Sequence, residues 1–239
     1  MLRLRVLSWN LGPENARWQD LAAVLSGWDW DVAALRGLPP RWPLPLSKSL
    51  DAEFRYAPAD REDASWLRRL VSGGPVPLVR SPAGPVDAIM ARRDRIVSEW
   101  PADDRRLRQA GVHVARLACG IWVGNRQGTG DDLVGELAAA IGSEALALAG
   151  PRGATGIDAL VGLAGAESPT ESPGLSLIEV ASGGEDVISA TPDLIPVTDA
   201  EVLAGGAVRG NPPLAVTLEH RVQDKPGRPG DGKPDRVAQ

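Results

Sequence analysis

The sequence predicts an α/β fold, in which strands and helices are layered on one another. Apolar residues alternate with polar ones over residues 2–9, recur at helical spacing over residues 18–25, and form a continuous run over residues 31–35. A period of two is typical of a half-buried strand, and a recurrence at every third or fourth residue is typical of an amphipathic helix. A strand, a helix and a second strand in quick succession indicate layered α/β structure.

The ends of these first elements can also be assigned. The first strand is expected to end near Trp9, and Gly27 is expected to cap the helix over residues 18–25. Glycine readily takes the backbone conformation that terminates a helix. After the buried strand at 31–35, residues 38–45 are expected to form a proline-rich exit from the strand.

The remaining elements are predicted from short apolar runs between turn residues. Strands are expected over residues 86–91, 95–100, 112–117, 121–123, 145–149, 175–180, 186–190 and 214–218. Two of these strands form a hairpin around Gly120. Residues 58–85 read as irregular with a short helix at 65–71, and the spacing of apolar residues predicts a further helix over residues 133–141.

The last residues differ in composition from the rest of the chain. Proline, glycine and charged residues dominate residues 221–239, and such a segment cannot bury apolar surface. We therefore expect one folded domain over residues 1–220 and a disordered tail over residues 221–239.

Composition excludes several classes of function. The 26 basic and 31 acidic residues give a net charge of −5, so the basic face that duplex nucleic acid requires is not expected. No apolar stretch approaches the roughly 18 residues of a membrane span, which predicts a cytoplasmic protein without a membrane partner. The single cysteine, Cys119, precludes a disulfide within the chain and is expected to be inert. Phosphate loops, zinc-ligand spacings and nucleophile elbows are absent from the sequence.

Short motifs stand in a fixed order along the chain. The first expected strand ends in Asn10, a later one contains Asp87-Ala-Ile-Met90, and the hairpin residues 120–127 contain Asn125. This order resembles that of the endonuclease/exonuclease/phosphatase superfamily, which has the deoxyribonuclease-I-like fold. In that family the first strand ends in an asparagine, a later strand reads Asn-Ala-Ile-Leu, and the hairpin carries Asn-Leu-His. Asp186 stands at the family's Ile-Asp-His-Val element. A second placing of that element, at residues 156–160, leaves no room for the segment that normally precedes it.

The resemblance spans residues 3–218 and implies a four-layer α-β-β-α sandwich of two mixed sheets flanked by helices. It also implies magnesium-dependent phosphoester hydrolysis, in which a glutamate holds the metal, an aspartate orients water and a histidine stabilises the transition state. By this resemblance the metal-binding glutamate falls on Gly37, the water-orienting aspartate on Pro151 and its partnering asparagine on Gly153. The hairpin histidine falls on Gln127, and the family's final aspartate–histidine pair falls on Gly210 and Asn211. The family residues Asn10, Asn125 and Asp186 remain.

These substitutions predict a catalytically degenerate protein with no catalytic residues, no bound metal and no cofactor. Its function would then be non-hydrolytic binding or scaffolding, with a protein or a small phosphorylated ligand as partner. The alternative is a magnesium-dependent phosphodiesterase, nuclease or phosphatase with a rearranged active site, for which magnesium would be required.

Several side chains have two interpretations. Arg36 could bind phosphate or be a solvated surface arginine. Asn10 and Asp186 could line a vestigial cleft or merely support the strand ends. His113 and His220 fill no family role and are expected at the surface. Four tryptophans lie on apolar faces and are expected in the core: Trp9, Trp18, Trp28 and Trp122.

The tail is predicted to be dispensable for folding. Truncation after His220 should leave the melting temperature unchanged, because the removed residues have little apolar surface to bury. Thermal unfolding followed by circular dichroism tests this. A decrease of several degrees would show that the tail packs on the domain.

Overall fold

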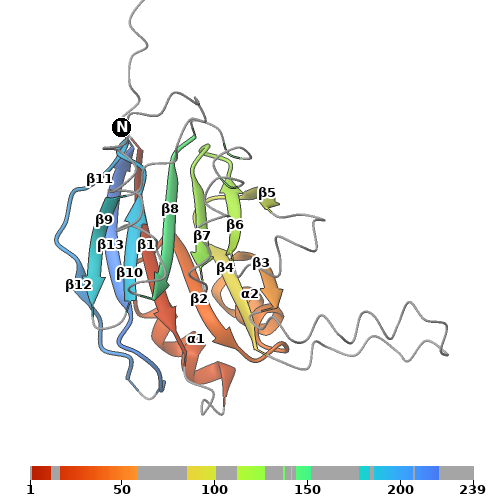
Figure 1. The fold of residues 1–239 in the computed structure, drawn as a ribbon. Coiled ribbons are helices and arrows are strands. Elements are labelled where there is room, and N and C mark those ends of the chain that lie inside the picture. Colours follow the sequence, from red (N-terminus) through yellow and green to blue (C-terminus); the bar gives the residue numbers. More distant parts are fainter. Residues whose placement is uncertain are drawn as a thin grey trace, which may run out of the picture.

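The fold is a sandwich of two sheets. The computed structural model describes residues 2–11, 17–58, 85–100, 112–126, 137, 141, 144–151, 178–183, 186–206 and 208–220. Within these residues, the strands form two sheets that face each other, with helices outside them (Figure 1). The α/β class and the two mixed sheets predicted from the sequence are confirmed.

The first sheet contains both ends of the described chain. Its described strands are β1 (Leu2–Asn10), β2 (Val32–Leu38), β3 (Glu53–Pro58), β4 (Val86–Ala91), β11 (Leu194–Pro196), β12 (Glu201–Val202) and β13 (Leu214–His220). They run in the order β11-β13-β1-β2-β4-β3, and β12 pairs with β13. β1 is parallel to β2, and antiparallel to β13. The first and last strands are therefore neighbours near the middle of this sheet.

The second sheet is built from the middle of the sequence. Its described strands are β5 (Ile96–Trp100), β6 (Val112–Leu117), β7 (Trp122–Arg126), β8 (Leu146–Pro151), β9 (Ile178–Gly183) and β10 (Asp186–Ala190), in the order β5-β6-β7-β8-β10-β9. β7 and β8 are parallel, and the other pairs are antiparallel. The strand lengths were predicted to within about three residues, as is usual for element boundaries.

Two helices cover the outer face of the first sheet, and two helical residues pack on the outer face of the second. α1 (Trp18–Ser26) and α2 (Pro43–Leu50) pack their apolar residues on the outer side of the first sheet. On the outer side of the second sheet, Leu137 and Ile141 are helical and buried against residues of β6, β7 and β8. The remaining residues of the helix predicted over 133–141 lie outside the described part, as does the helix predicted at 65–71.

Three apolar clusters follow from strand alternation. Residues of even number on β1 and β2, such as Val6 and Ala34, face the second sheet and belong to the central cluster. Their neighbours Leu7 and Leu35 point the other way, toward α1 and α2. Successive side chains of a strand point to opposite faces, so one sheet serves two cores. Both faces of the strands are buried, which explains their continuous apolar runs.

The proline-rich exit from the second strand leads into a helix that the sequence did not predict. Residues 43–50 form α2, with Pro43 in its first turn. Proline is tolerated there because the backbone N–H groups of the first helical turn have no partner within the helix. Leu46 and Leu50 recur at helical spacing and are buried, and this spacing outweighs the prolines. The strands β3, β11 and β12 were not predicted, because they are short or partly exposed.

The tryptophans behave as predicted. Trp9 and Trp122 are buried, and Trp18 and Trp28 are partly buried against the second apolar cluster. Trp9 and Trp28 contact each other, with ring centroids 5.3 Å apart.

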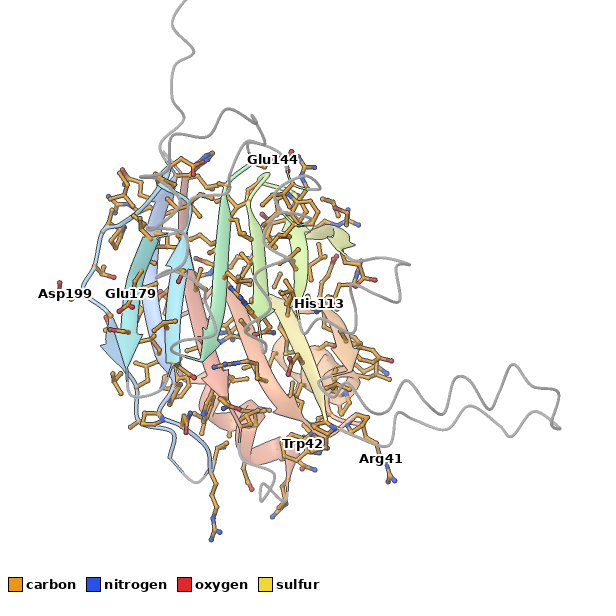
Figure 2. The ribbon with its side chains drawn as sticks, viewed as in Figure 1. Arg41, Trp42, His113, Glu144, Glu179 and Asp199 are labelled. Atoms are coloured by element: carbon orange, nitrogen blue, oxygen red, sulfur yellow. The ribbon has the colours of Figure 1, made fainter. Side chains whose placement is uncertain are left out.

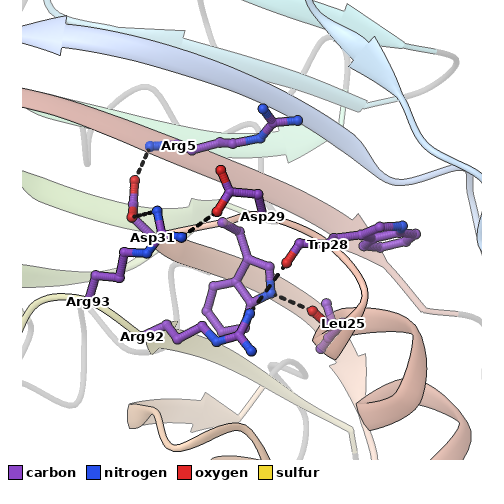
Figure 3. A network of polar contacts seen from close by, with 8 residues as sticks. Arg5, Leu25, Trp28, Asp29, Asp31, Arg92 and Arg93 are labelled. Atoms are coloured by element: carbon purple, nitrogen blue, oxygen red, sulfur yellow. Dashed lines mark hydrogen bonds and ion pairs between the residues drawn. The ribbon is translucent and has the colours of Figure 1, made fainter.

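A polar network fixes the connection between α1 and β2 (Figure 3). Arg93 forms ion pairs with Asp29 and Asp31, and Asp31 accepts a hydrogen bond from the backbone N–H of Arg5. Arg92 lies over the ring of Trp30, 5.3 Å from its centroid. The network holds the N-terminal end of β2. Arg36 lies near the other end of β2, where it is the register partner of Asn10 on β1.

No helix in the described part of the chain is long and apolar enough to cross a membrane.

Close packing in the second sheet leaves no space for a side chain at Gly124. A Cβ atom there would lie 2.3 Å from Val114 Cγ1 and 2.5 Å from the backbone oxygen of His113. We expect Gly124→Ala to lower the free energy of unfolding by about 2 kcal/mol or more, because the neighbouring strand must move. In Gly27→Ala, a matched control, the new Cβ meets its nearest atom at 3.5 Å, and we expect a change within about 1 kcal/mol. Urea denaturation of both variants tests this, and equal stability would contradict it.

Candidate functional site

Strand register gathers polar side chains at one end of the sandwich interior. Asn10 ends β1 and is the register partner of Arg36 near the end of the parallel strand β2. Asp186 begins β10 in the opposing sheet, and Asn125 lies near the end of β7. By alternation, Arg36 shares its face with Ala34, and Asp186 shares its face with Ile188, both of which are in the central cluster. The polar side chains therefore lie on the inner faces of the sheets, at the edge of the central apolar cluster.

An ion pair between Arg36 and Asp186 joins the two sheets. The guanidinium Nη2 lies 2.6 Å from the carboxylate Oδ1, and the two side chains are 3% and 0% exposed. The geometry is that of an ion pair rather than of an aligned hydrogen bond. The interpretation of Arg36 as a solvated surface residue was therefore wrong. Arg36 is two residues after Ala34 and four after Val32, so strand alternation places its side chain on the same inner face. The sequence could have predicted this.

Asn125 bridges the sheets beside this ion pair. Its Nδ2 donates hydrogen bonds to the backbone oxygens of Ala88 at 3.1 Å and Leu35 at 3.5 Å, both in the first sheet. Asp87, on the inner face of β4, accepts a hydrogen bond from the backbone N–H of Gly37 at 3.1 Å. These contacts fix the ends of β2, β4 and β7 relative to each other.

Three of the substituted positions surround Asn10 at the edge of the sandwich. The backbone oxygen of Asn10 accepts a hydrogen bond from the N–H of Asn211 at 3.0 Å, and Leu11 pairs with Gly210 in an isolated β-bridge. A Cβ atom at Gly37 would lie 3.8 Å from Asn10 Oδ1. The structure thus brings Asn10, Gly37, Gly210 and Asn211 together.

Gly37 has a backbone that a side chain would strain. Its φ of +74° is in the left-handed region, and a Cβ atom would lie 2.6 Å from the backbone oxygen of Leu11. Arg36 is therefore the residue of this strand end whose side chain enters the interior.

Pro151 is also brought next to Asp186. It ends β8 and is the register partner of Asp186 on β10. A proline has no backbone N–H, and it has no carboxylate with which to orient water. Gln127 and Gly153 lie outside the described residues, as do the second placing of the Asp186 element and the tail.

The surface placement predicted for His113 was wrong. His113 lies on β6 (Figure 2). It is 5% exposed, is the register partner of Asn125, and shares the inner face with Ala115 and Leu117 by strand alternation. Its Nε2 lies 3.3 Å from Glu99 Oε2. The alternation of β6 could have indicated this, but one polar residue in an apolar strand is also compatible with an exposed face. His220 is partly buried and lies 3.2 Å from Asp193.

Cys119 has the environment of an unreactive thiol. Burial, followed by a hydrogen bond with Asp94, raises its pKa to about 11. The thiolate is the nucleophilic form, so little of it is present near neutral pH.

No family model and no curated protein sequence matches the chain. Solved structures, in contrast, match over nearly its whole length. The endonuclease/exonuclease/phosphatase from Bacteroides vulgatus matches with a TM-score of 0.62 at 12% identity, covering 92% of this chain and 100% of that one.

Two further solved structures show the same likeness. The catalytic domain of human Nocturnin with bound sulfate has a TM-score of 0.54 at 13% identity, covering 92% of this chain and 94% of that one. A mannosyl-6-phosphatase from Bacteroides thetaiotaomicron has a TM-score of 0.52 at 13% identity, covering 92% and 100%. The chain therefore has the endonuclease/exonuclease/phosphatase fold that its motifs implied.

The described residues of this cleft do not fit a magnesium ion. Magnesium takes carboxylate and water oxygens in an octahedral arrangement. The carboxylate of Asp186 is instead held by a guanidinium, whose positive charge would repel a cation. Within the described ranges, no three acidic, histidine or cysteine side chains form a group that could hold a metal.

The ion pair predicts a strong energetic coupling. Arg36→Met and Asp186→Leu should each lower the free energy of unfolding by about 3–5 kcal/mol, because each leaves an unpaired buried charge. The double variant removes both charges and should lose much less than the sum of the two losses. Chemical denaturation of all four proteins measures the coupling. Additive losses would show that the pair does not act as a unit.

Proposed function

We propose that this chain, with its endonuclease/exonuclease/phosphatase fold, is a non-hydrolytic binding or scaffolding module. The main support for this proposal is the buried ion pair between Arg36 and Asp186. In a metal-dependent phosphoesterase, a carboxylate at such a cleft must be available to the metal. Here the guanidinium supplies the compensating positive charge from within the chain. The remaining acid therefore has a counter-ion without any metal.

The substitutions around the ion pair support the same proposal. Pro151 beside Asp186 cannot orient an attacking water, and Asn211 beside Asn10 replaces the histidine that the resemblance implies for the transition state. Catalytic groups of this kind act as a unit, so the loss of several leaves little for the others to do.

The partner is proposed from the same resemblance. The Nocturnin domain carries a sulfate, and the Bacteroides enzyme is a mannosyl-6-phosphatase. A small phosphorylated ligand, or a protein, is accordingly the proposed partner. The alternative, a rearranged magnesium-dependent phosphodiesterase, nuclease or phosphatase, is tested by the following experiments.

Wild-type protein should neither bind magnesium nor hydrolyse a phosphodiester. We expect calorimetric titration with Mg²⁺ to give no dissociation constant tighter than about 1 mM. Bis-p-nitrophenyl phosphate with Mg²⁺ or Mn²⁺ should be hydrolysed at the background rate. Hydrolysis well above background that disappears in Asp186→Ala would establish the enzyme alternative.

Exchanging the guanidinium for a carboxylate should create a metal response. Arg36→Glu places two carboxylates side by side in the interior, and such a pair must either share a proton or bind a cation. We expect Mn²⁺ to raise the melting temperature of Arg36→Glu, through binding to the folded state, and to leave wild type unchanged.

Two further variants are its controls. Arg36→Gln removes the positive charge without adding a carboxylate, and it should respond much less to Mn²⁺. Gly37→Glu should be destabilised without a metal response, because Gly37 has a left-handed backbone against Leu11. A flat Mn²⁺ response of Arg36→Glu would contradict the idea that the guanidinium takes the place of a cation.

A further inference from the structure

The two described sheets end in four edge strands, two at each side of the sandwich. β3 and β5 lie at one side, and β9 and β11 lie at the other (Figure 1). Side chains of β3 bind the backbone of β5. The guanidinium of Arg55 donates to the backbone oxygen of Ile96 at 3.4 Å, and the carboxylate of Glu53 accepts from its N–H at 3.0 Å. Backbone groups of β5 are therefore already engaged at that side.

β9 is the edge of the second sheet at the other side. Among the described strands it pairs only with β10, so alternate residues of β9 direct their backbone N–H and C=O groups away from the sheet. A bulge at Val180 divides it into two short runs, 178–179 and 181–183. β9 contains neither lysine nor proline, which commonly protect such edges, whereas β3 ends at Pro58 and β11 at Pro196. A further strand can therefore pair with β9.

Exposed apolar side chains flank this edge. They are Ile178 on β9, Val197 between β11 and β12, and Val202 on β12. Val202 lies against the end of β9, since a Cβ atom at Gly183 would be 2.9 Å from Val202 Cγ2. A strand added to β9 can cover part of this apolar surface, and removing such surface from water is favourable.

The same edge is acidic. Residues 153–208, which include β9 to β12, contain nine aspartates and glutamates and no lysine, arginine or histidine. Asp199 is exposed at this side of the sandwich (Figure 2), and its carboxylate has no hydrogen-bond or ion-pair partner among the described residues. Glu201 is neutralised by Arg5 of β1, so it adds little to the excess of negative charge. The potential around an edge follows the sum of its charges, and this one favours a basic partner.

We propose that the edge of β9 binds an extended, basic segment of a partner protein by strand addition. The main chain of the segment pairs with β9, its apolar side chains cover Ile178 and Val202, and its lysines or arginines face Asp199. The proposal rests on the proposed function, because it takes a protein as the partner, and it specifies the chemistry of that partner. A second copy of this chain would bring the same acidic edge, so charge disfavours it as the occupant.

A synthetic peptide tests the proposal on the full chain. The probe is acetyl-Lys-Val-Arg-Val-Lys-Val-Arg-amide, and fluorescence polarisation of a labelled copy measures its dissociation constant. One control peptide has glutamate in place of every basic residue. The other has a methyl group on every backbone nitrogen, so it keeps the charge but cannot donate main-chain hydrogen bonds. We expect saturable binding of the probe and binding about tenfold weaker, or none, for both controls.

Two matched variants locate the binding. Ile178→Lys adds a positive charge to the edge of β9, and Val97→Lys adds one to β5, the opposite edge strand of the same sheet. Both side chains are exposed, Ile178 by 44% and Val97 by 52%, so both variants should fold. Ile178→Lys should weaken binding about fivefold or more, whereas Val97→Lys, which changes the net charge equally, should leave it nearly unchanged.

Hydrogen exchange followed by NMR shows whether the peptide pairs with the backbone. In wild type the probe should slow the exchange of those β9 amides that do not bond to β10, and it should leave the amides of β5 unchanged.

Five outcomes would overturn the proposal. They are no saturable binding of the probe, equal binding of the N-methylated peptide, equal effects of the two lysine variants, β9 amides that are all protected without peptide, and a dimer through β9 that excludes the peptide. Each leaves the magnesium tests of the proposed function unaffected. Conversely, hydrolysis of bis-p-nitrophenyl phosphate that depends on Asp186 would defeat the proposed function while β9 still bound the peptide.

Discussion

The two sheets meet at a buried ion pair, and the arrangement of the cleft depends on it. Arg36 comes from β2 of the first sheet and Asp186 from β10 of the second, and neither side chain reaches solvent appreciably. A charge in this interior is tolerated only when it is paired. The register of β2 on β1 and of β10 on β8 must therefore place these two residues opposite each other. Asn10 and Pro151, their register partners, are positioned by the same requirement.

In this arrangement the buried carboxylate has a different counter-ion from that in a metal enzyme. A hydrolase of this architecture would leave its carboxylates available for a divalent cation, which serves both as counter-ion and as catalyst. The guanidinium of Arg36 can serve as counter-ion alone. What remains in the interior is a set of hydrogen-bonding groups, including Asn125 and His113.

Much of the fold could be predicted, because the strands have strong periodic signals. The alternation in β1, the helical spacing of α1 and the turn at Gly120 were sufficient to predict their elements. α2 was missed because prolines are usually read as helix breakers, although they are compatible with a first helical turn. The fold itself was implied by the order of the motifs, because that order follows the order of the strands. The pairing of Arg36 and the burial of His113 were not predicted.

The sequence by itself determined which chemical groups the strand ends carry and which are absent: an arginine and a glycine after Leu35, a proline at 151 and an asparagine at 211. The identities are read directly from the sequence. Local periodicity assigns them to strand ends, because it depends only on neighbours in the chain. Only the tertiary structure decided that Arg36 faces Asp186, and that His113 stands beside Asn125. Those contacts join residues far apart in sequence, through the packing of one sheet on the other and the register of paired strands. No local pattern encodes a partner 150 residues away, so the electrostatics of the cleft appear only when the sheets are packed.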